Sequence, residues 1–174
     1  MRTLARAADH LRIGDAMPFR VFLSSSLDPA DAALAWRLQT LATANGIEMY
    51  VPAHGSPGPS SVAASVRKAI DRADCVLAIL TAAASPNVQF ELGYALQKGK
   101  LVIPIVRQEF AGSEPMARFP RVFTFSPFDD PGHVETQIVG FLKEQQISRE
   151  KQQAIGALAA LGLGLLLLVS LNKE

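Results

Sequence analysis

The sequence is poor in cysteine, in histidine and in excess charge. Cys75 is the only cysteine among 174 residues, which excludes an intramolecular disulfide and a cysteine-rich zinc site and indicates a reducing compartment. It lies in an apolar run, so we expect a buried structural thiol. The three histidines, His10, His54 and His133, are isolated in the sequence, so no metal site is expected. The 17 basic residues nearly balance the 16 acidic ones, and nothing favours binding to nucleic acid.

Several familiar catalytic motifs are also missing. The chain has no G-x-x-x-x-G-K-[ST] phosphate loop, and no G-x-G-x-x-G follows a strand-like run. It has neither an H-E-x-x-H zinc motif nor a G-x-S-x-G nucleophile elbow. Any chemistry that the protein performs must therefore come from another arrangement of residues.

Apolar residues are in excess, and the surplus is concentrated near the C-terminus. Hydrophobic residues make up 49% of the chain and charged residues only 19%, below the roughly 25% that is usual in soluble domains. Residues 154–171 include no charge, and as a helix they would be about 27 Å long, close to the hydrocarbon thickness of a bilayer. We expect a single C-terminal transmembrane helix; a buried oligomerisation helix is the alternative.

Charges beside this segment predict its orientation. Lys143, Arg149 and Lys151 precede it and Lys173 follows it, so the positive-inside tendency places the preceding domain in the cytoplasm of a single-pass membrane protein. The expected parts are an N-terminal segment, a globular domain, a polar linker and the membrane helix, over residues 1–18, 19–146, 147–153 and 154–171. One face of the last helix carries small residues spaced by four, which permits self-association. They are Gly156, Ala160 and Gly164.

The globular part alternates between short apolar runs and helical periodicity. Strands are expected at 19–24, 47–51, 75–80, 100–106 and 121–125, and helices at 31–45, 61–73, 87–98 and 133–146. Strands that are apolar on both faces and separated by helices predict an α/β fold with a parallel sheet covered on both sides. Such sheets bind ligands where their strands end, here in the loops after Ser24, Val51, Leu80 and Val106. Pro104 favours an edge position for its strand.

Two of these strand ends carry polar residues. The serines at 24–26 either satisfy the loop backbone and cap the next helix, or hydrogen-bond a ligand. Further along, Ser85 or Asn87 can cap a helix in which Glu91 falls near the first turn, where the helix dipole favours an ionised carboxylate. Gly93 costs that helix roughly 1 kcal/mol relative to alanine, which predicts that something approaches its backbone closely.

A series of short segments follows in a specific order: V-F-L-S-S-S, I-E-M-Y-V, a loop with S-P-G, V-R-K-A-I-D-R-A, D-C-V-L-A-I-L-T and F-E-L-G-Y-A. Over about residues 19–145 this order resembles a Toll/interleukin-1 receptor (TIR) domain of the bacterial type. The resemblance implies a flavodoxin-like fold, with a parallel sheet of about five strands and helices on both faces. The segment N-V-Q-F-E-L-G-Y-A also resembles, more distantly, nucleoside 2-deoxyribosyltransferases, which place a nucleophilic glutamate at a similar point.

The resemblance implies a site and a substrate. Glu91 stands where enzymatic TIR domains carry the glutamate that cleaves NAD, and Phe90 approximates an aromatic residue that many of them carry shortly before it. NAD is then the substrate, and no cofactor is expected. The expected substrate-binding residues are Ser24, Ser25, His54, Ser85, Asn87 and Phe90. One carboxylate suffices because the nicotinamide of NAD is cationic and leaves as a neutral molecule, without the general acid that ordinary glycosidases need.

The expected function is therefore that of a membrane-anchored NAD glycohydrolase or ADP-ribose cyclase in antiphage defence or signalling. Self-association is expected because TIR enzymes usually need it for activity. Two alternatives stay open. One is a non-catalytic TIR adapter, and the other is a nucleoside or nucleotide N-glycosidase or deoxyribosyltransferase.

Overall fold

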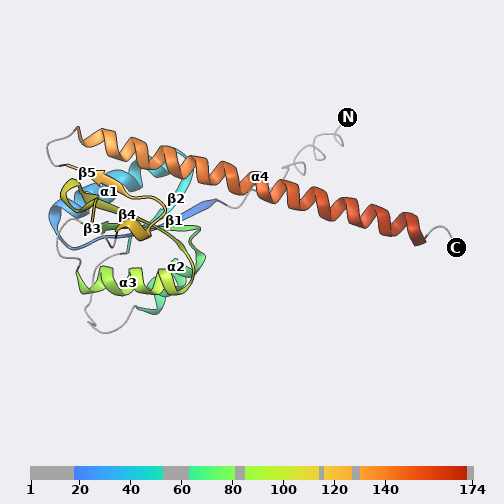
Figure 1. The fold of residues 1–174 in the computed structure, drawn as a ribbon, viewed down its shortest axis with the longest axis horizontal. Helices are drawn as coiled ribbons and strands as arrows, with labels where there is room; N and C mark the ends of the chain where they lie inside the picture. Colours follow the sequence, from blue (N-terminus) through green and yellow to red (C-terminus); the bar gives the residue numbers. More distant parts are fainter. Residues whose placement is uncertain (1–17, 53–62, 81–84, 114–115, 127–129, 172–174) are drawn as a thin grey trace, which may run out of the picture.

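Strands and helices alternate along the chain (Figure 1). The computed structural model describes residues 18–52, 63–80, 85–113, 116–126 and 130–171, without the side chains of Pro131 and of residues 153–171. The strands are β1 (Phe19–Ser24), β2 (Ile47–Tyr50), β3 (Cys75–Leu80), β4 (Leu101–Arg107) and β5 (Phe123–Phe125). The helices are α1 (Pro29–Ala44), α2 (Ala64–Arg72), α3 (Pro86–Gln97) and α4 (Pro131–Leu171), with two short 3-10 helices, η2 (Gln108–Phe110) and η3 (Met116–Arg118).

The five strands form one parallel sheet in the order β2-β1-β3-β4-β5. This confirms the parallel α/β architecture that the sequence pattern predicts. Because the strands run in one direction, all of them end on the same side of the sheet, which we name the carboxyl edge. The side on which they begin is named the amino edge. The register aligns Ser24 at the end of β1 with Ala78 of β3, so β1 and β3 deliver their last residues to neighbouring points of the carboxyl edge.

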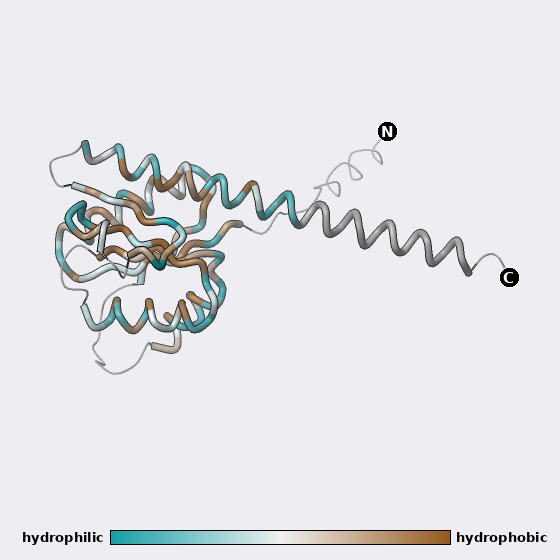
Figure 2. The backbone as a smooth tube through the Cα atoms, viewed as in Figure 1, coloured by the Kyte–Doolittle hydropathy of each residue, from teal (hydrophilic) through white to brown (hydrophobic). Residues whose placement is uncertain are grey.

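Helices cover both faces of the sheet. Helices α1 and α4 pack together over one face, and α2 and α3 over the other (Figure 1). Leu38 of α1 and Leu142 of α4 are fully buried in the first core, and Ile70 of α2 is fully buried in the second. The central strands are the most hydrophobic part of the body, while the helices carry hydrophilic residues as well (Figure 2). The sheet is therefore the common core of both layers.

Local signals start and stop the helices. The carboxylate of Asp28 accepts a hydrogen bond of 2.8 Å from the backbone N–H of Ala30 and caps α1, and Pro29 occupies the first helical position. Gly46 follows α1 with φ +74°, and Gly99 follows α3 with φ +66°. These left-handed conformations favour glycine and let the chain turn back into β2 and β4.

The prediction that Pro104 lies in an edge strand is wrong. Strand β4 lies between β3 and β5, and Pro104 aligns with Ala78 of β3. The ladder with the short strand β5 begins only at Ile105, which aligns with Phe123. On its β5 side Pro104 is therefore not part of a ladder, and a residue without a backbone N–H is tolerated there for the same reason as at a true edge.

Helix α4 is longer than the predicted helix 133–146. It continues through the predicted linker 147–153 and ends at Leu171. Among the residues with described side chains, no helix combines the length and the apolarity needed to cross a bilayer. The predicted transmembrane helix 154–171 lies outside those residues. The predicted N-terminal segment, apart from Pro18, and most of the loop 52–60, including His54, also lie outside the description.

The predicted close approach to Gly93 is also wrong. A Cβ atom added to Gly93 would meet nothing within 4 Å, because this residue faces outward from α3. We therefore predict that Gly93→Ala raises the free energy of unfolding by about 0.5–1 kcal/mol, measured by urea denaturation.

A matched control distinguishes the effect of steric room around a glycine from the effect of its backbone conformation. Gly46 also has nothing within 4 Å of an added Cβ, but its φ is +74°. Gly46→Ala should therefore destabilise the protein, because alanine is strained in that conformation. Destabilisation by Gly93→Ala would contradict the open surroundings of that residue.

Candidate active site

Glu91 is a buried carboxylate on the inner side of α3. Ser85 caps this helix by accepting a hydrogen bond from the backbone N–H of Val88, and Pro86 is the first helical residue. Counted from Pro86, Glu91 is the sixth residue, in the second turn, just beyond the first turn near which the sequence places it. Its exposure is 6%, and it shares the inner face of the helix with the buried residues Val88 and Ala95. The helix dipole is therefore not its main partner, since that effect fades beyond the first turn.

The partner of Glu91 is Ser24, at the carboxyl end of β1. The Ser24 hydroxyl donates a hydrogen bond of 2.5 Å to Oε2 of Glu91, and Ser24 is fully buried. A hydroxyl bonded to a carboxylate at this distance is a charge-assisted hydrogen bond, which is stronger than a neutral one. The contact joins residues 67 positions apart in the chain. This hydrogen bond holds the inner face of α3 against the carboxyl edge of the sheet.

Two opposing effects act on the pKa of Glu91. Burial raises this pKa because it withdraws the charged form from water, and the hydrogen bond from Ser24 lowers it by favouring the carboxylate. Burial is the larger effect, so the pKa stays above its ordinary value. A shifted carboxyl group at the ligand-binding edge of a parallel sheet is a candidate for catalysis.

The other serines of the run have different environments. Ser25 is buried, with 2% exposure. The hydroxyl of Ser26 accepts a hydrogen bond from the backbone N–H of Asp28 (3.1 Å) and donates one to Oδ2 of Asp31 (2.5 Å). Ser26 thus supports the loop before α1, whereas Ser24 belongs to the carboxylate site. The loop-supporting interpretation of this run therefore applies to Ser26, and the ligand-binding interpretation stays a prediction.

The remaining predicted binding residues lie on or near α3. Ser85 uses its hydroxyl oxygen as the helix cap. Asn87 is exposed in the first turn, and Phe90, next to Glu91, is 41% exposed. His54 lies outside the described residues. The structure therefore joins Ser24 directly to Glu91, with Ser25 following Ser24 in the chain, and leaves Asn87 and Phe90 at the surface.

Sequence reasoning did not identify two other buried carboxylates. Asp31 of α1 is 2% exposed and Glu135 of α4 is 3% exposed. Oε1 of Glu135 accepts a hydrogen bond of 2.8 Å from Nε of Arg37 in α1, while its Oε2 is buried without a hydrogen-bond partner among the described residues. Glu135 lies four positions after Pro131 on a helix predicted only from apolar periodicity, a pattern that cannot single out a buried acid.

The thiol of Cys75 is buried as predicted. Cys75 is the first residue of β3 and has no exposed surface. Burial, and secondarily the neighbouring carboxylate of Asp74, raises the pKa of this thiol to about 12. A thiol held in its protonated form is a poor nucleophile, so Cys75 is a structural residue.

Comparison with known families identifies the fold. Residues 21–136, about two thirds of the chain, match the family described as TIR domain. The chain belongs to the TIR domain family. The matched residues contain most of β1, all of β2 to β5 and the start of α4, and with them both Ser24 and Glu91. No curated protein has a significant match to the sequence.

Solved structures share the TIR fold at low sequence identity. The RPS4 and RRS1 TIR domain heterodimer is 11% identical, with a TM-score of 0.58, and the match covers 75% of this chain and 99% of that one. The TIR domains of the activated Roq1 resistosome, which directly recognises the effector XopQ, are 14% identical, with a TM-score of 0.54 over 70% of this chain and 98% of that one.

A glycosidase has a similar fold. The CMP N-glycosidase BcmB of Clostridium botulinum is 17% identical, with a TM-score of 0.55, and the match covers 70% of this chain and 98% of that one. At these identities the likeness shows the fold alone. The more distant resemblance to nucleoside 2-deoxyribosyltransferases receives no support from these matches.

The two effects on Glu91 predict the outcome of removing Ser24. In Ser24→Ala the burial remains and the hydrogen bond that lowers the pKa is lost, so the pKa of Glu91 should rise further. The measurement is a ¹³C NMR titration of the Glu91 carboxyl signal, assigned by its loss in Glu91→Gln. Ser25→Ala is the control and should leave the pKa unchanged; a lower pKa in Ser24→Ala would refute this account of the site.

The raised pKa also predicts how stability depends on pH. The folded state disfavours the ionised form of Glu91, so the wild-type protein loses stability as the pH rises from the ordinary glutamate pKa of about 4.3 through the raised pKa of the folded state. Glu91→Gln lacks this loss. Its free energy of unfolding relative to wild type should therefore increase between about pH 4 and pH 8, measured by urea denaturation. A difference that is constant with pH would show that Glu91 is not perturbed.

Proposed function

We propose that this TIR protein cleaves the N-glycosidic bond of NAD between nicotinamide and ribose, with Glu91 as the catalytic carboxylate. The observation that supports this proposal most strongly is the buried Glu91 carboxylate, which Ser24 holds at 2.5 Å at the carboxyl edge of the sheet. Parallel sheets bind their ligands at this edge. A partly desolvated carboxylate acts there on developing positive charge more strongly than it would in water.

The leaving group explains why one carboxylate is sufficient. The nicotinamide ring of NAD carries a positive charge, so cleavage of its bond to C1′ of the ribose releases neutral nicotinamide and leaves an oxocarbenium-like ribose. Glu91 stabilises this cation or traps it covalently at C1′. Attack by water then gives ADP-ribose and a proton, and attack by a group of the same molecule gives a cyclic product. A second carboxylic acid, which ordinary glycosidases need to protonate the leaving oxygen, has no role in this reaction.

Ser24 is a positioning residue in this mechanism. The reaction needs the carboxylate form of Glu91, which burial disfavours and the hydrogen bond from Ser24 favours. The hydrogen bond also fixes Oε2, and in this proposal Oε1 is the oxygen that faces the substrate. Ser25, Ser85, Asn87, Phe90 and His54 remain the proposed substrate contacts, and no cofactor is needed.

Self-association is part of the proposal. Two of the similar TIR structures come from assemblies, namely a TIR domain heterodimer and a resistosome. The same arrangement of several chains is proposed here. In this protein, association would bring several copies of the Glu91 site together.

We also propose that the protein works at a membrane, with its TIR domain in the cytoplasm, in antiphage defence or signalling. The proposed attachment rests on the uncharged run 154–171 in the sequence. Within the structure, α4 continues as a helix over these residues to Leu171. A membrane-bound enzyme of this kind would deplete NAD or release a nucleotide signal beside the membrane.

A nucleotide N-glycosidase is the second candidate. The fold is similar to that of the CMP N-glycosidase BcmB, which acts on a nucleotide. Its substrate differs from NAD because a neutral base is a poorer leaving group and requires protonation when it departs. A non-catalytic TIR adapter is the third candidate. In an adapter, the hydrogen bond between Ser24 and Glu91 would serve only to hold α3 against the sheet.

The test is NAD turnover by the full-length protein at high concentration. Wild type should release nicotinamide, and Glu91→Gln should lower the rate by roughly 10²–10³-fold, the loss expected when a main electrostatic group is removed. Glu109→Gln, which changes an exposed carboxylate in η2, is the matched control and should retain the wild-type rate. The mass of the product distinguishes ADP-ribose from a cyclic product.

Other substrates in the same assay distinguish the alternatives. Release of cytosine from CMP, lost in Glu91→Gln, would favour the nucleotide N-glycosidase. Turnover of NAD that Glu91→Gln leaves unchanged would refute the proposed catalytic role. An assembled protein that cleaves neither substrate would favour the adapter.

A further inference from the structure

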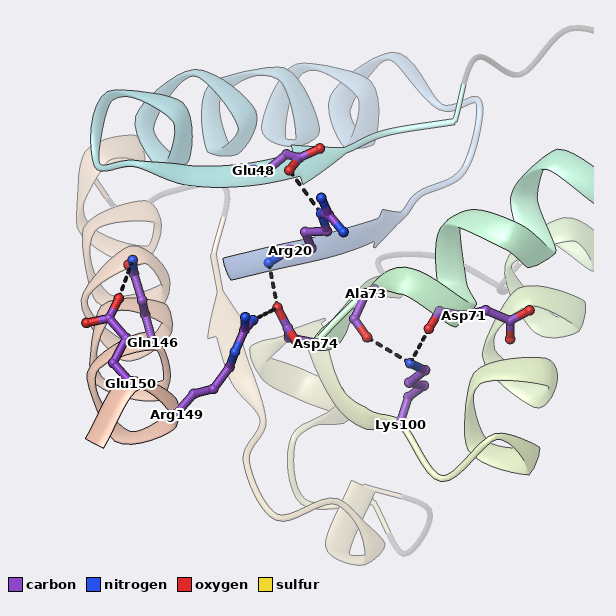
Figure 3. A network of polar contacts seen from close by, with 9 residues as sticks. All are labelled: Arg20, Glu48, Asp71, Ala73, Asp74, Lys100, Gln146, Arg149 and Glu150. Carbon is purple, nitrogen blue, oxygen red and sulfur yellow. Dashed lines mark hydrogen bonds and ion pairs between the residues drawn. The ribbon is translucent and has the colours of Figure 1, made fainter. Parts of the chain in front are cut away.

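Helix α4 crosses the height of the sheet before it leaves the globular body. It begins after β5, which ends at the carboxyl edge. At the amino edge, Arg149 of α4 forms an ion pair and hydrogen bond with Asp74, the residue before β3 (Figure 3). The other partner of Asp74 is the backbone N–H of Arg20 in β1, at 2.8 Å. Asp74 therefore fastens α4 to the beginnings of the two central strands.

The uncharged run begins just beyond this attachment. Ala154 is the fifth residue after Arg149, which corresponds to about 7.5 Å along the helix. The helix is continuous between the two residues, so the direction of the run is set by the body. A membrane that contains residues 154–171 would therefore face the amino edge of the sheet.

The amino edge is rich in positive charge. Its strand beginnings and helix ends carry the cations Arg20, Arg72, Lys98, Lys100, Arg118 and Arg121. Its carboxylates are fewer in the described part of the chain, and each has a partner. Glu48 pairs with Arg20 and Asp74 with Arg149, while Asp71 accepts a hydrogen bond from the Tyr94 hydroxyl and Glu150 accepts one from the Gln146 amide. The side chains of Arg72, Lys98 and Arg118 are exposed to solvent.

The carboxyl edge has the opposite character. Its described residues include the acids Asp28, Asp31, Glu91, Glu109, Asp130 and Glu135, against the cations Arg37 and Arg107. The two edges are separated by the length of a strand, about 20 Å for six residues. The charges of the described residues are therefore distributed unevenly along the strand direction, with cations prevailing at one edge and acids at the other, a distribution that would orient the domain at a charged surface.

A hollow at the amino edge adds an apolar component. Its volume is about 560 Å³, and it is lined by Leu96, Val102, Phe119 and Pro120 beside Lys100 and Arg118. Leu96 is 50% exposed there. Apolar surface beside cationic side chains fits a phospholipid, whose headgroup is anionic and whose glycerol and first methylenes are apolar.

We propose that the amino edge is a lipid-facing surface that binds anionic headgroups, through Arg72, Lys98 and Arg118, and so turns the Glu91 site away from the membrane. This inference rests on the membrane attachment in the proposed function. The ion pair between Arg149 and Asp74 sets the orientation, and the charge of the edge supplies the attraction. Substrate then enters the site from the aqueous side, about one strand length from the lipid surface.

The orientation can be tested with one fluorophore at each edge of the full-length protein. The single native cysteine is buried and weakly acidic, so a thiol-reactive NBD probe goes selectively to an introduced cysteine. Ala117→Cys in η3 labels the amino edge, and Glu109→Cys in η2 labels the carboxyl edge; both positions are exposed. The labelled proteins are reconstituted in phosphatidylcholine vesicles with or without phosphatidylglycerol, and a headgroup spin label serves as the quencher.

Quenching in vesicles that contain phosphatidylglycerol should be roughly threefold stronger at position 117 than at 109, since the edges differ by about 20 Å in distance from the lipid. Flotation of the vesicles reports membrane attachment by itself. Equal quenching at the two positions overturns the proposed orientation. A chain that floats with neither vesicle overturns the proposal together with the membrane attachment, and NAD turnover in detergent reports separately on the proposed enzymatic activity.

Charge variants test the headgroup binding. In the triple variant Arg72→Gln/Lys98→Gln/Arg118→Gln, the extra quenching at position 117 that phosphatidylglycerol produces should disappear, while NAD turnover in detergent stays at the wild-type rate. Arg107→Gln, a cation at the carboxyl edge, is the matched control and should retain the extra quenching. Extra quenching that survives in the triple variant overturns the role of these three cations.

Discussion

The hydrogen bond between Ser24 and Glu91 is the contact on which the candidate site depends. A carboxylate taken out of water is destabilising unless a donor meets it, and the Ser24 hydroxyl is that donor. The contact is possible because the Ser85 cap sets the start of α3, which turns Val88, Glu91 and Ala95 toward the sheet. It also needs β1 to end beside β3, as the register of the sheet requires. The site therefore depends both on which face of α3 is turned toward the sheet and on the register between β1 and β3.

The parallel sheet gives the molecule two chemically different ends. At the carboxyl edge, acids outnumber cations among the described residues, and the buried Glu91 lies there against Ser24. At the amino edge, cations surround the contact between Arg149 and Asp74, from which α4 leaves the body (Figure 3). The directionality of the strands therefore separates proposed catalysis from proposed lipid contact by about the length of one strand. Helix α4 covers one face of the sheet, and its C-terminal part is the proposed membrane attachment. The direction of this helix therefore determines how the Glu91 site is oriented relative to the membrane.

Much of the fold could be predicted from the pattern of apolar residues. The five strands and four helices of the globular part lie close to their expected positions, because strands buried on both faces leave apolar runs that helices do not. Errors arose where a local rule depends on the surroundings. Gly93 suggested a close contact, but its side of α3 is open. Pro104 suggested an edge strand, but β4 lies inside the sheet. Its neighbour β5 is short and pairs with β4 only from Ile105 onward, so Pro104 has no pairing partner on that side.

The sequence by itself determined the alternation of strands and helices and the membership of the TIR family. It also pointed to Glu91 as the candidate catalytic residue. These follow from local periodicity and from the order of short motifs, which are properties of neighbouring residues. Only the tertiary structure decided that Ser24 and not Ser26 reaches Glu91, that burial raises the pKa of this glutamate, and that Arg149 of α4 meets Asp74. Each of these depends on contacts between segments far apart in the chain, where the exclusion of water and the strand register set the distances and no local pattern records them.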